Sequence, residues 1–147
     1  MHDKDPDSTG YLLGQLCRLH HARIRTEFQA LGLYRGQPPL LSTLHDEEGQ
    51  TQSELAERLH VTRATMTKML QRMQKAGWIS RRPDEHDQRA MRVYLTDAGR
   101  AVRGEMHAIL DRLDQETLDG FTMEERVLFR RLLLLARDNL RRYNEET

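Results

Sequence analysis

Residues 51–99 read TQSELAERLHVTRATMTKMLQRMQKAGWISRRPDEHDQRAMRVYLTDAG. The stretch opens with Thr51-Gln-Ser-Glu54, a capping-box pattern in which the threonine hydroxyl accepts from the glutamate backbone N–H and the carboxylate accepts from that of the threonine. One apolar helix face follows, supplied by Leu55, Ala56 and Leu59. These residues predict a short helix that ends at the break His60-Val61-Thr62.

A second helix is predicted to begin at Thr62, a preferred N-cap residue type. Its apolar residues recur at helical spacing and must face a core: Met66, Met69, Leu70 and Met73. The opposite side is polar and mostly basic, and it carries Arg63, Thr67, Lys68, Gln71, Arg72 and Lys75. Such a face suits a groove lined by phosphates.

A β-hairpin is predicted after this helix. Gly77 stands where a C-cap glycine would, and Trp78-Ile79 begins an extended segment. From Met91 to Thr96 apolar and polar residues alternate, which is typical of a half-buried strand. The polar loop 83–89 joins the two strands as a wing, with Arg89 near its tip. The fold class is therefore mainly α with a small β-hairpin wing, a winged helix-turn-helix.

The stretch resembles the MarR family of bacterial transcription regulators. The resemblance lies in TQSELA, in TRATMTKMLQRMQKAGWI, and in a D-x-R wing that ends in R-V-Y-L-T-x-x-G. It implies a single MarR-like domain over residues 1–147, with a DNA-binding lobe at 37–99. It also implies dimerisation helices at 9–31 and 100–143, and a homodimer that binds a double-stranded DNA operator.

Charge is distributed in the way that this resemblance requires. The whole chain has a net charge of zero, yet residues 51–96 hold nine basic and five acidic side chains. Residues 1–50 and 97–147 each carry a net charge of −2. Arginines on a helix face are often only solvated, but here helix and wing agree in sign, which favours nucleic acid.

Size and composition set further bounds. A chain of 147 residues with 37% hydrophobic content fits one domain. No apolar run approaches the roughly 20 residues that span a membrane, and the N-terminus lacks a signal-peptide pattern, so a cytoplasmic protein without a membrane partner is expected. A single cysteine, Cys17, excludes an internal disulfide.

Helices are also predicted on both sides of residues 51–99. The first runs from about Thr9 to Leu31, and a second begins at Gly36-Gln37-Pro38-Pro39. Thr96 can cap a long helix that reaches about Leu118, and Thr122 to Glu125 forms another capping box. The final helix is apolar over a wide arc, which indicates burial either within the chain or, as the resemblance favours, against a second subunit.

The predicted DNA contacts follow from residue type and position. The residues expected in the major groove are Arg63, Thr65, Thr67, Lys68, Gln71 and Arg72. Ser53 and Thr62 stand at helix starts and are expected near phosphates. Arg89 is expected in the minor groove, where the family's wing pattern implies that Asp87 orients it by an ion pair. The alternative for Asp87 is an ordinary turn aspartate.

The resemblance also implies a sensing function, most often a repressor released by a small anionic aromatic or lipophilic effector. His20, His21, Arg25 and His45 are candidates to line an effector cleft, although such histidines are more often packed or solvated. Cys17, in a Gln-Leu-Cys context, resembles the peroxide-sensing branch, but His21 stands where that branch has a tyrosine. The alternative for Cys17 is an ordinary buried thiol.

No enzyme is predicted. The sequence has no Gly-rich phosphate loop, nucleophile elbow or H-E-x-x-H motif, and no cofactor is implied. His107 and Asp111 are four residues apart but have no further ligand at metal-binding spacing, so no metal site is predicted. A rival interpretation is a winged helix that binds only protein, which leaves the basic helix and wing unexplained.

Overall fold

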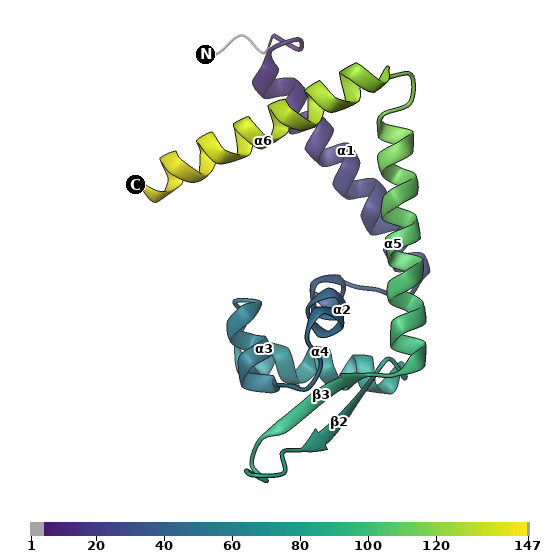
Figure 1. Ribbon diagram of the computed structural model, residues 1–147, viewed down its shortest axis with the longest axis vertical. Coiled ribbons are helices and arrows are strands. Elements are labelled where there is room, and N and C mark those ends of the chain that lie inside the picture. The colour runs from purple at the N-terminus through teal and green to yellow at the C-terminus, as the bar shows by residue number, and fades with distance from the viewer. Residues whose placement is uncertain (1–4, 147) are drawn as a thin grey trace. The chain divides into compact units, whose positions relative to one another are not determined.

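The computed structural model describes residues 5–146. Its elements are α1 (Thr9–Ala30), α2 (Gln37–Asp46), β1 (Gln50–Thr51), α3 (Gln52–Arg58), α4 (Arg63–Lys75), β2 (Ile79–Pro83), β3 (Met91–Leu95), α5 (Asp97–Thr117) and α6 (Met123–Glu145) (Figure 1). The predicted mainly helical fold with a β-hairpin wing is confirmed. The chain divides into two compact units between residues 110 and 111, and each is described by itself.

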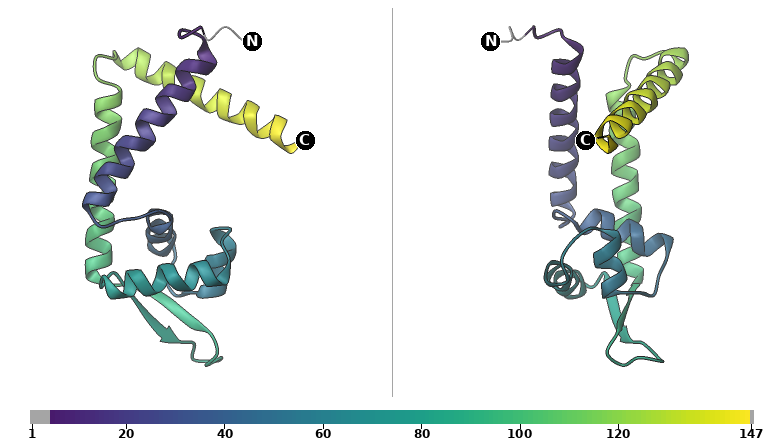
Figure 2. Two further views of the ribbon diagram at one scale, coloured as in Figure 1. Left: turned by 180° about the vertical axis from the view of Figure 1, so that it is seen from behind. Right: turned by 90° about the vertical axis from the view of Figure 1, so that its left-hand side faces the viewer.

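The sheet has three antiparallel strands in the order β1-β3-β2. Ile79 pairs with Leu95 and Arg82 with Arg92, and the β2–β3 hairpin extends beyond the helices as the wing (Figure 2). The short strand β1, which pairs Gln50 with Val93, was missing from the sequence prediction because two residues are too few to show alternation. The buried amide of Gln50 holds it in place, since it donates to the Glu47 carbonyl oxygen at 2.7 Å and accepts from Arg58 at 2.8 Å.

The core of the first unit lies between α2, α3, α4 and the inner face of the hairpin. Its fully buried side chains include Leu40, Leu41, Leu44, Leu55, Met66, Leu70, Met73 and Val93. The predicted apolar face of α4 is therefore confirmed. Helix α2 begins as predicted, with Gly36 at the N-cap and proline in the first turn.

The start of α5 is joined closely to the hairpin. Thr96 accepts from the backbone N–H of Gly99 at 3.0 Å and donates to the Gly77 carbonyl oxygen, and its own N–H donates to the carbonyl of Trp78. A Cβ atom at Gly99 would overlap that Trp78 carbonyl oxygen. The glycine of the R-V-Y-L-T-x-x-G motif is thus required by the close approach of two backbone segments.

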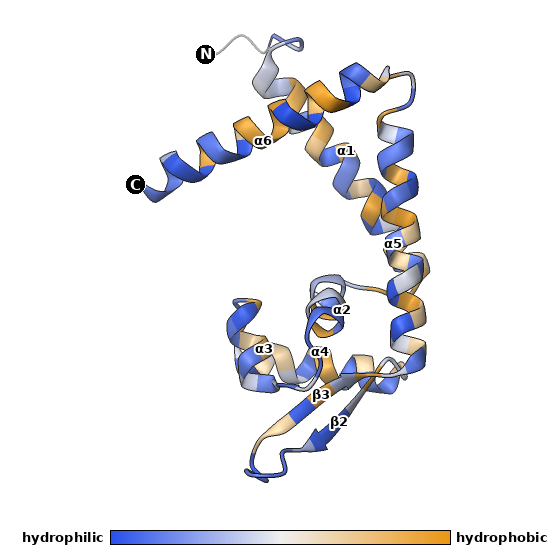
Figure 3. Ribbon diagram, in the orientation of Figure 1, coloured by the Kyte–Doolittle hydropathy of each residue, from blue (hydrophilic) through white to orange (hydrophobic). Residues whose placement is uncertain are grey.

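The second unit contains the end of α5, a turn at Gly120 with φ of +80°, and α6. The predicted capping box of Thr122 and Glu125 is present, and the rings of Phe121 and Phe129 pack edge to face with centroids 5.6 Å apart. No residue of α6 is buried, and apolar residues recur along its exposed surface (Figure 3). The choice between burial within the chain and burial against a second subunit stays a prediction. None of the described helices is long and apolar enough to cross a bilayer.

Candidate nucleic-acid interface

Helix α4 presents one face to the core and one to solvent. The Thr62 hydroxyl accepts from the backbone N–H of Thr65 at 3.1 Å, so the predicted N-cap is confirmed. The exposed side carries Arg63, Thr65, Lys68, Gln71, Arg72 and Lys75. This face offers cations and the amide of Gln71 to a ligand that approaches along the helix.

Thr67 is less accessible than the other predicted contacts. It is half-buried, its hydroxyl donates to the Arg63 carbonyl oxygen at 2.9 Å, and it lies 3.5 Å from the amide nitrogen of Gln52. Thr65 remains exposed, although its hydroxyl is 3.0 Å from that of Thr62. The two threonines that sequence reasoning treated alike therefore have different surroundings.

A hollow of about 250 Å³ brings the helix starts and the wing together. Its lining residues are Thr51, Gln52, Ser53, Arg63, Thr67, Arg89, Ala90 and Met91. Ser53, in the first turn of α3, and Arg63, at the start of α4, thus share one surface with Arg89 of the wing. Two guanidinium groups, from α4 and from the wing, thus line one hollow, and this setting favours an anion.

Asp84 and Arg92 hold the base of the wing. The Nε atom of Arg92 donates to the Asp84 carboxylate at 2.6 Å, and its Nη1 atom donates to the Gly49 carbonyl oxygen at 2.6 Å. Asp84 also accepts from the backbone N–H of Asp87 at 3.1 Å. The hydrogen bond from Arg92 lowers the pKa of the Asp84 carboxyl, and the same bond raises the pKa of Arg92.

The predicted ion pair between Asp87 and Arg89 is wrong. Within residues 5–146 the Asp87 carboxylate accepts instead from the backbone N–H of Arg89, at 3.0 Å, and the Arg89 side chain is exposed. In a tight turn the short aspartate side chain reaches the backbone two residues on more readily than it reaches a long guanidinium. Asp87 therefore shapes the turn, and the ion pair that ties the wing together is Asp84–Arg92.

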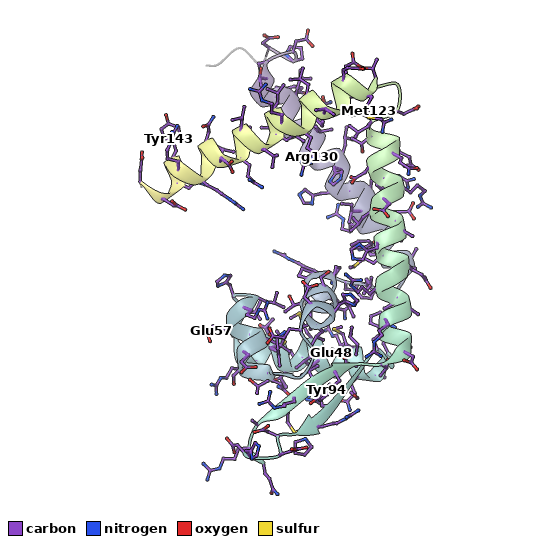
Figure 4. All side chains as sticks on the ribbon, in the orientation of Figure 1. Glu48, Glu57, Tyr94, Met123, Arg130 and Tyr143 are labelled. Atoms are coloured by element: carbon purple, nitrogen blue, oxygen red, sulfur yellow. The ribbon has the colours of Figure 1, made fainter. Side chains whose placement is uncertain are left out.

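Sequence reasoning also missed Arg81. Its Nε atom donates to Gln74 at 2.8 Å and its Nη1 atom donates to Gln52 at 3.1 Å, so it connects β2 to both helices of the helix-turn-helix. The neighbouring Arg82 instead lies over the ring of Tyr94, 4.7 Å from the ring centroid. Figure 4 labels Tyr94, which lies on the hairpin. The inward position of Arg81 could have been predicted from the sequence, because Arg81 is two residues from the buried Ile79 and so lies on the same face of the strand.

The candidate sensing residues lie on α1 and α2. Cys17 is exposed, and the rings of His20 and His21 pack edge to face with centroids 6.3 Å apart. Arg25 is exposed on α1 and His45 is exposed in the last turn of α2. A common effector cleft for these residues stays a prediction. In the part of the chain that the structure describes, no group of three His, Cys, Asp or Glu residues is placed to hold a metal ion.

Comparison with known proteins identifies the family. The sequence model of the MarR family matches residues 33–91. The transcriptional regulator HosA of Escherichia coli O127:H6 is 34% identical over 121 residues, which cover 82% of this chain and 88% of HosA. The chain belongs to the MarR family. It is accordingly a transcriptional regulator and not an enzyme.

Solved structures agree with the MarR assignment. The apo form of wild-type MarR from E. coli matches with a TM-score of 0.73 at 25% identity, over 88% of this chain and 96% of that protein. A point mutant of S. aureus MepR, bound to an oligodeoxyribonucleotide, also matches with a TM-score of 0.73, at 22% identity over 90% of this chain and 98% of MepR. The likeness to MepR is one of fold.

Proposed function

We propose that this MarR-family chain forms one functional domain, residues 1–147, which binds duplex DNA as a homodimer and represses transcription. Helix α4 enters the major groove and Arg89 of the wing enters the adjacent minor groove. The observation that carries the proposal is the hollow shared by Ser53, Arg63 and Arg89, because the guanidinium groups of α4 and the wing line one surface that suits a polyanion. The similar fold of MepR bound to an oligodeoxyribonucleotide supports it.

The exposed groups of α4 divide by chemistry. The side chains of Gln71 and Arg72 can each form two hydrogen bonds to one base edge, whereas Lys68 is a point charge suited to phosphates. Ser53 and Thr62, at helix starts, are suited to phosphate contacts as well. Asp87 acts indirectly, through the turn that presents Arg89.

Dimerisation explains the apolar surface of the terminal helices. Exposed apolar side chains recur on α1 and α6, among them Leu12, Leu16, Leu19, Val127, Leu128, Leu132 and Leu135. A helix with so many unburied apolar residues is expected to bury them against a partner. Two copies of α4 separated by one turn of DNA, about 34 Å, would then read a pseudo-palindrome.

The decisive experiment is a salt titration of binding to a duplex that the chain itself selects from a random-sequence pool. The logarithm of affinity should fall linearly with the logarithm of salt concentration. Arg89→Ala should weaken binding about tenfold and reduce the slope by about one, while the neighbouring Gln88→Ala leaves both unchanged. A chain that enriches no sequence would overturn operator binding and favour the protein-interaction alternative.

Release of DNA is proposed to follow binding of a small anionic effector near His20, His21, Arg25 and His45. The exposure of Cys17 favours a second candidate trigger, peroxide. The two are separated by adding peroxide to DNA complexes of the wild type and of Cys17→Ser. Release in the wild type alone assigns sensing to the thiol, and release in neither variant leaves the anionic effector as the trigger.

A further inference from the structure

The side chain of Arg81 points toward the helices of the lobe. Arg81 pairs with Val93 across the β2–β3 ladder, and the Val93 side chain is fully buried. Residues opposite each other in an antiparallel pair lie on the same face of the sheet. Arg81 therefore lies on the inner face of the hairpin, which contacts α3 and α4, and it is half-buried there.

Its guanidinium connects three elements. The Nε atom donates to the side-chain oxygen of Gln74 near the end of α4, and Nη1 donates to that of Gln52 at the start of α3. The amide nitrogen of Gln52 lies 3.5 Å from the Thr67 hydroxyl, which in turn donates to the Arg63 carbonyl oxygen. A continuous chain of polar contacts thus runs from the strand, through α3, to the first turn of α4.

The contacts of Arg81 distinguish the glutamines of the proposed DNA-binding surface from one another. A glutamine amide is a bidentate partner for adenine, and Gln52, Gln71 and Gln74 all belong to the helix-turn-helix. The side-chain oxygens of Gln52 and Gln74 are occupied by Arg81. Gln71 is exposed and has no hydrogen-bond partner among the residues that the structure describes.

We propose that Arg81 is a positioning residue that fixes α4 against α3 and withholds Gln52 and Gln74 from the bases, which leaves Gln71 as the amide that reads sequence. The inference rests on the proposed DNA binding. The planar fork of a guanidinium suits this task because its donors leave in fixed directions, whereas a lysine ammonium cannot span both oxygens in the same geometry. Arg81 acts through the protein and does not contact phosphate.

The first test concerns the contact in the absence of DNA. Thermal unfolding of Arg81→Met, Gln74→Met and the double variant forms a mutant cycle. If the two side chains share one interaction, the double variant loses less of the unfolding temperature than the sum of the single losses. Additive losses would overturn the connection.

The second test measures discrimination, the ratio of the dissociation constants for a random duplex and for the selected duplex. Arg81→Met should lower this ratio about tenfold, the scale of one lost base contact, with the salt slope unchanged. Gln71→Met should lower it to a similar extent. Arg82→Met is the matched control, since Arg82 is the next residue and lies over Tyr94, and it should leave discrimination unchanged.

The outcomes separate the two proposals. A salt slope reduced by about one in Arg81→Met would make Arg81 a phosphate contact and overturn the positioning role. Unchanged discrimination in a folded Arg81→Met chain would also overturn it. If Arg81→Met does not fold, Gln52→Met keeps Arg81 in place, removes one partner and must show the same loss. A wild-type chain that does not discriminate at all would instead refute sequence-specific binding itself.

Discussion

Helix α3, in the lobe of residues 37–99, and helix α6 begin with the same capping motif, but the apolar side chains of the lobe and of α6 differ in burial. Thr51 with Glu54, and Thr122 with Glu125, form capping boxes with nearly the same hydrogen-bond lengths. The lobe then buries leucine, methionine and valine completely, whereas α6 leaves Leu132 about half exposed, at 51%. Local signals therefore determine where a helix begins, and they say nothing about what covers it.

The largest expected difference between the two regions concerns leucine truncation. Leu70→Ala removes a fully buried side chain and should lower the free energy of unfolding by about 2–5 kcal/mol at any protein concentration. Leu132→Ala should act through the proposed dimer, so its loss should depend on protein concentration. Urea unfolding at two concentrations measures both. An equal, concentration-independent loss for Leu132→Ala would mean that this leucine packs within its own chain.

Two glycines of α5 allow a packed and an unpacked position to be compared within one helix. Gly99→Ala places a Cβ against the Trp78 carbonyl oxygen and should destabilise the chain by about 1–3 kcal/mol. Gly104→Ala meets nothing within 4 Å and should stabilise it by roughly 0.5–1 kcal/mol, because alanine favours a helix over glycine. Thermal unfolding of the two variants should therefore shift in opposite directions. Destabilisation by both would indicate that Gly104 is covered in the assembled protein.

The capping boxes provide a matched pair of smaller effects. Replacement of an N-cap threonine by alanine costs about 0.5–2 kcal/mol. Thr51→Ala should lower the stability of the whole lobe, because α3 packs in its core. Thr122→Ala should mainly increase hydrogen exchange in the first turns of α6. Protection that falls throughout the lobe in Thr122→Ala would contradict the separation of the two regions.

Much of the lobe was predictable from sequence because its signals are local and repeated. The N-caps at Thr51 and Thr62, the break at Gly77 and the alternation in β3 were all predicted and are all present. Strand β1 was missed because two residues carry no periodicity. The wrong pairing of Asp87 arose because a motif gives spacing along the chain, whereas the partner of a carboxylate depends on the geometry of the turn.

The site itself was only partly predictable. Arg63, Lys68 and Gln71 follow from helical periodicity, and their exposure agrees with it. The role of Arg81 depends on a contact with Gln52, 29 residues away, which no local pattern encodes. The sequence also could not predict which surface packs against α6. Its apolar arc is compatible with packing inside the chain or against another copy.

The smallest predicted effect is a dependence on pH at the wing. Because Arg92 lowers the pKa of Asp84 in the folded chain, the stabilisation is present above the ordinary aspartate pKa of about 3.9 and is lost as pH falls through the lower folded value. Asp84→Asn should therefore unfold at a lower temperature than the wild type by a constant margin from about pH 7 to pH 5, and the margin should shrink below about pH 4.

Glu85→Gln is the control for this effect, because the adjacent carboxylate is exposed and no hydrogen bond to it is present in the described chain. It should match the wild type across the same pH range. A margin for Asp84→Asn that persists unchanged at low pH would show that the substitution acts through packing or hydrogen-bond geometry and not through charge. A margin that closes would assign the order of the wing to the Asp84–Arg92 ion pair. The charge of Arg92 would then stabilise the protein, whereas the exposed charge of Arg89 is the one proposed to contact DNA.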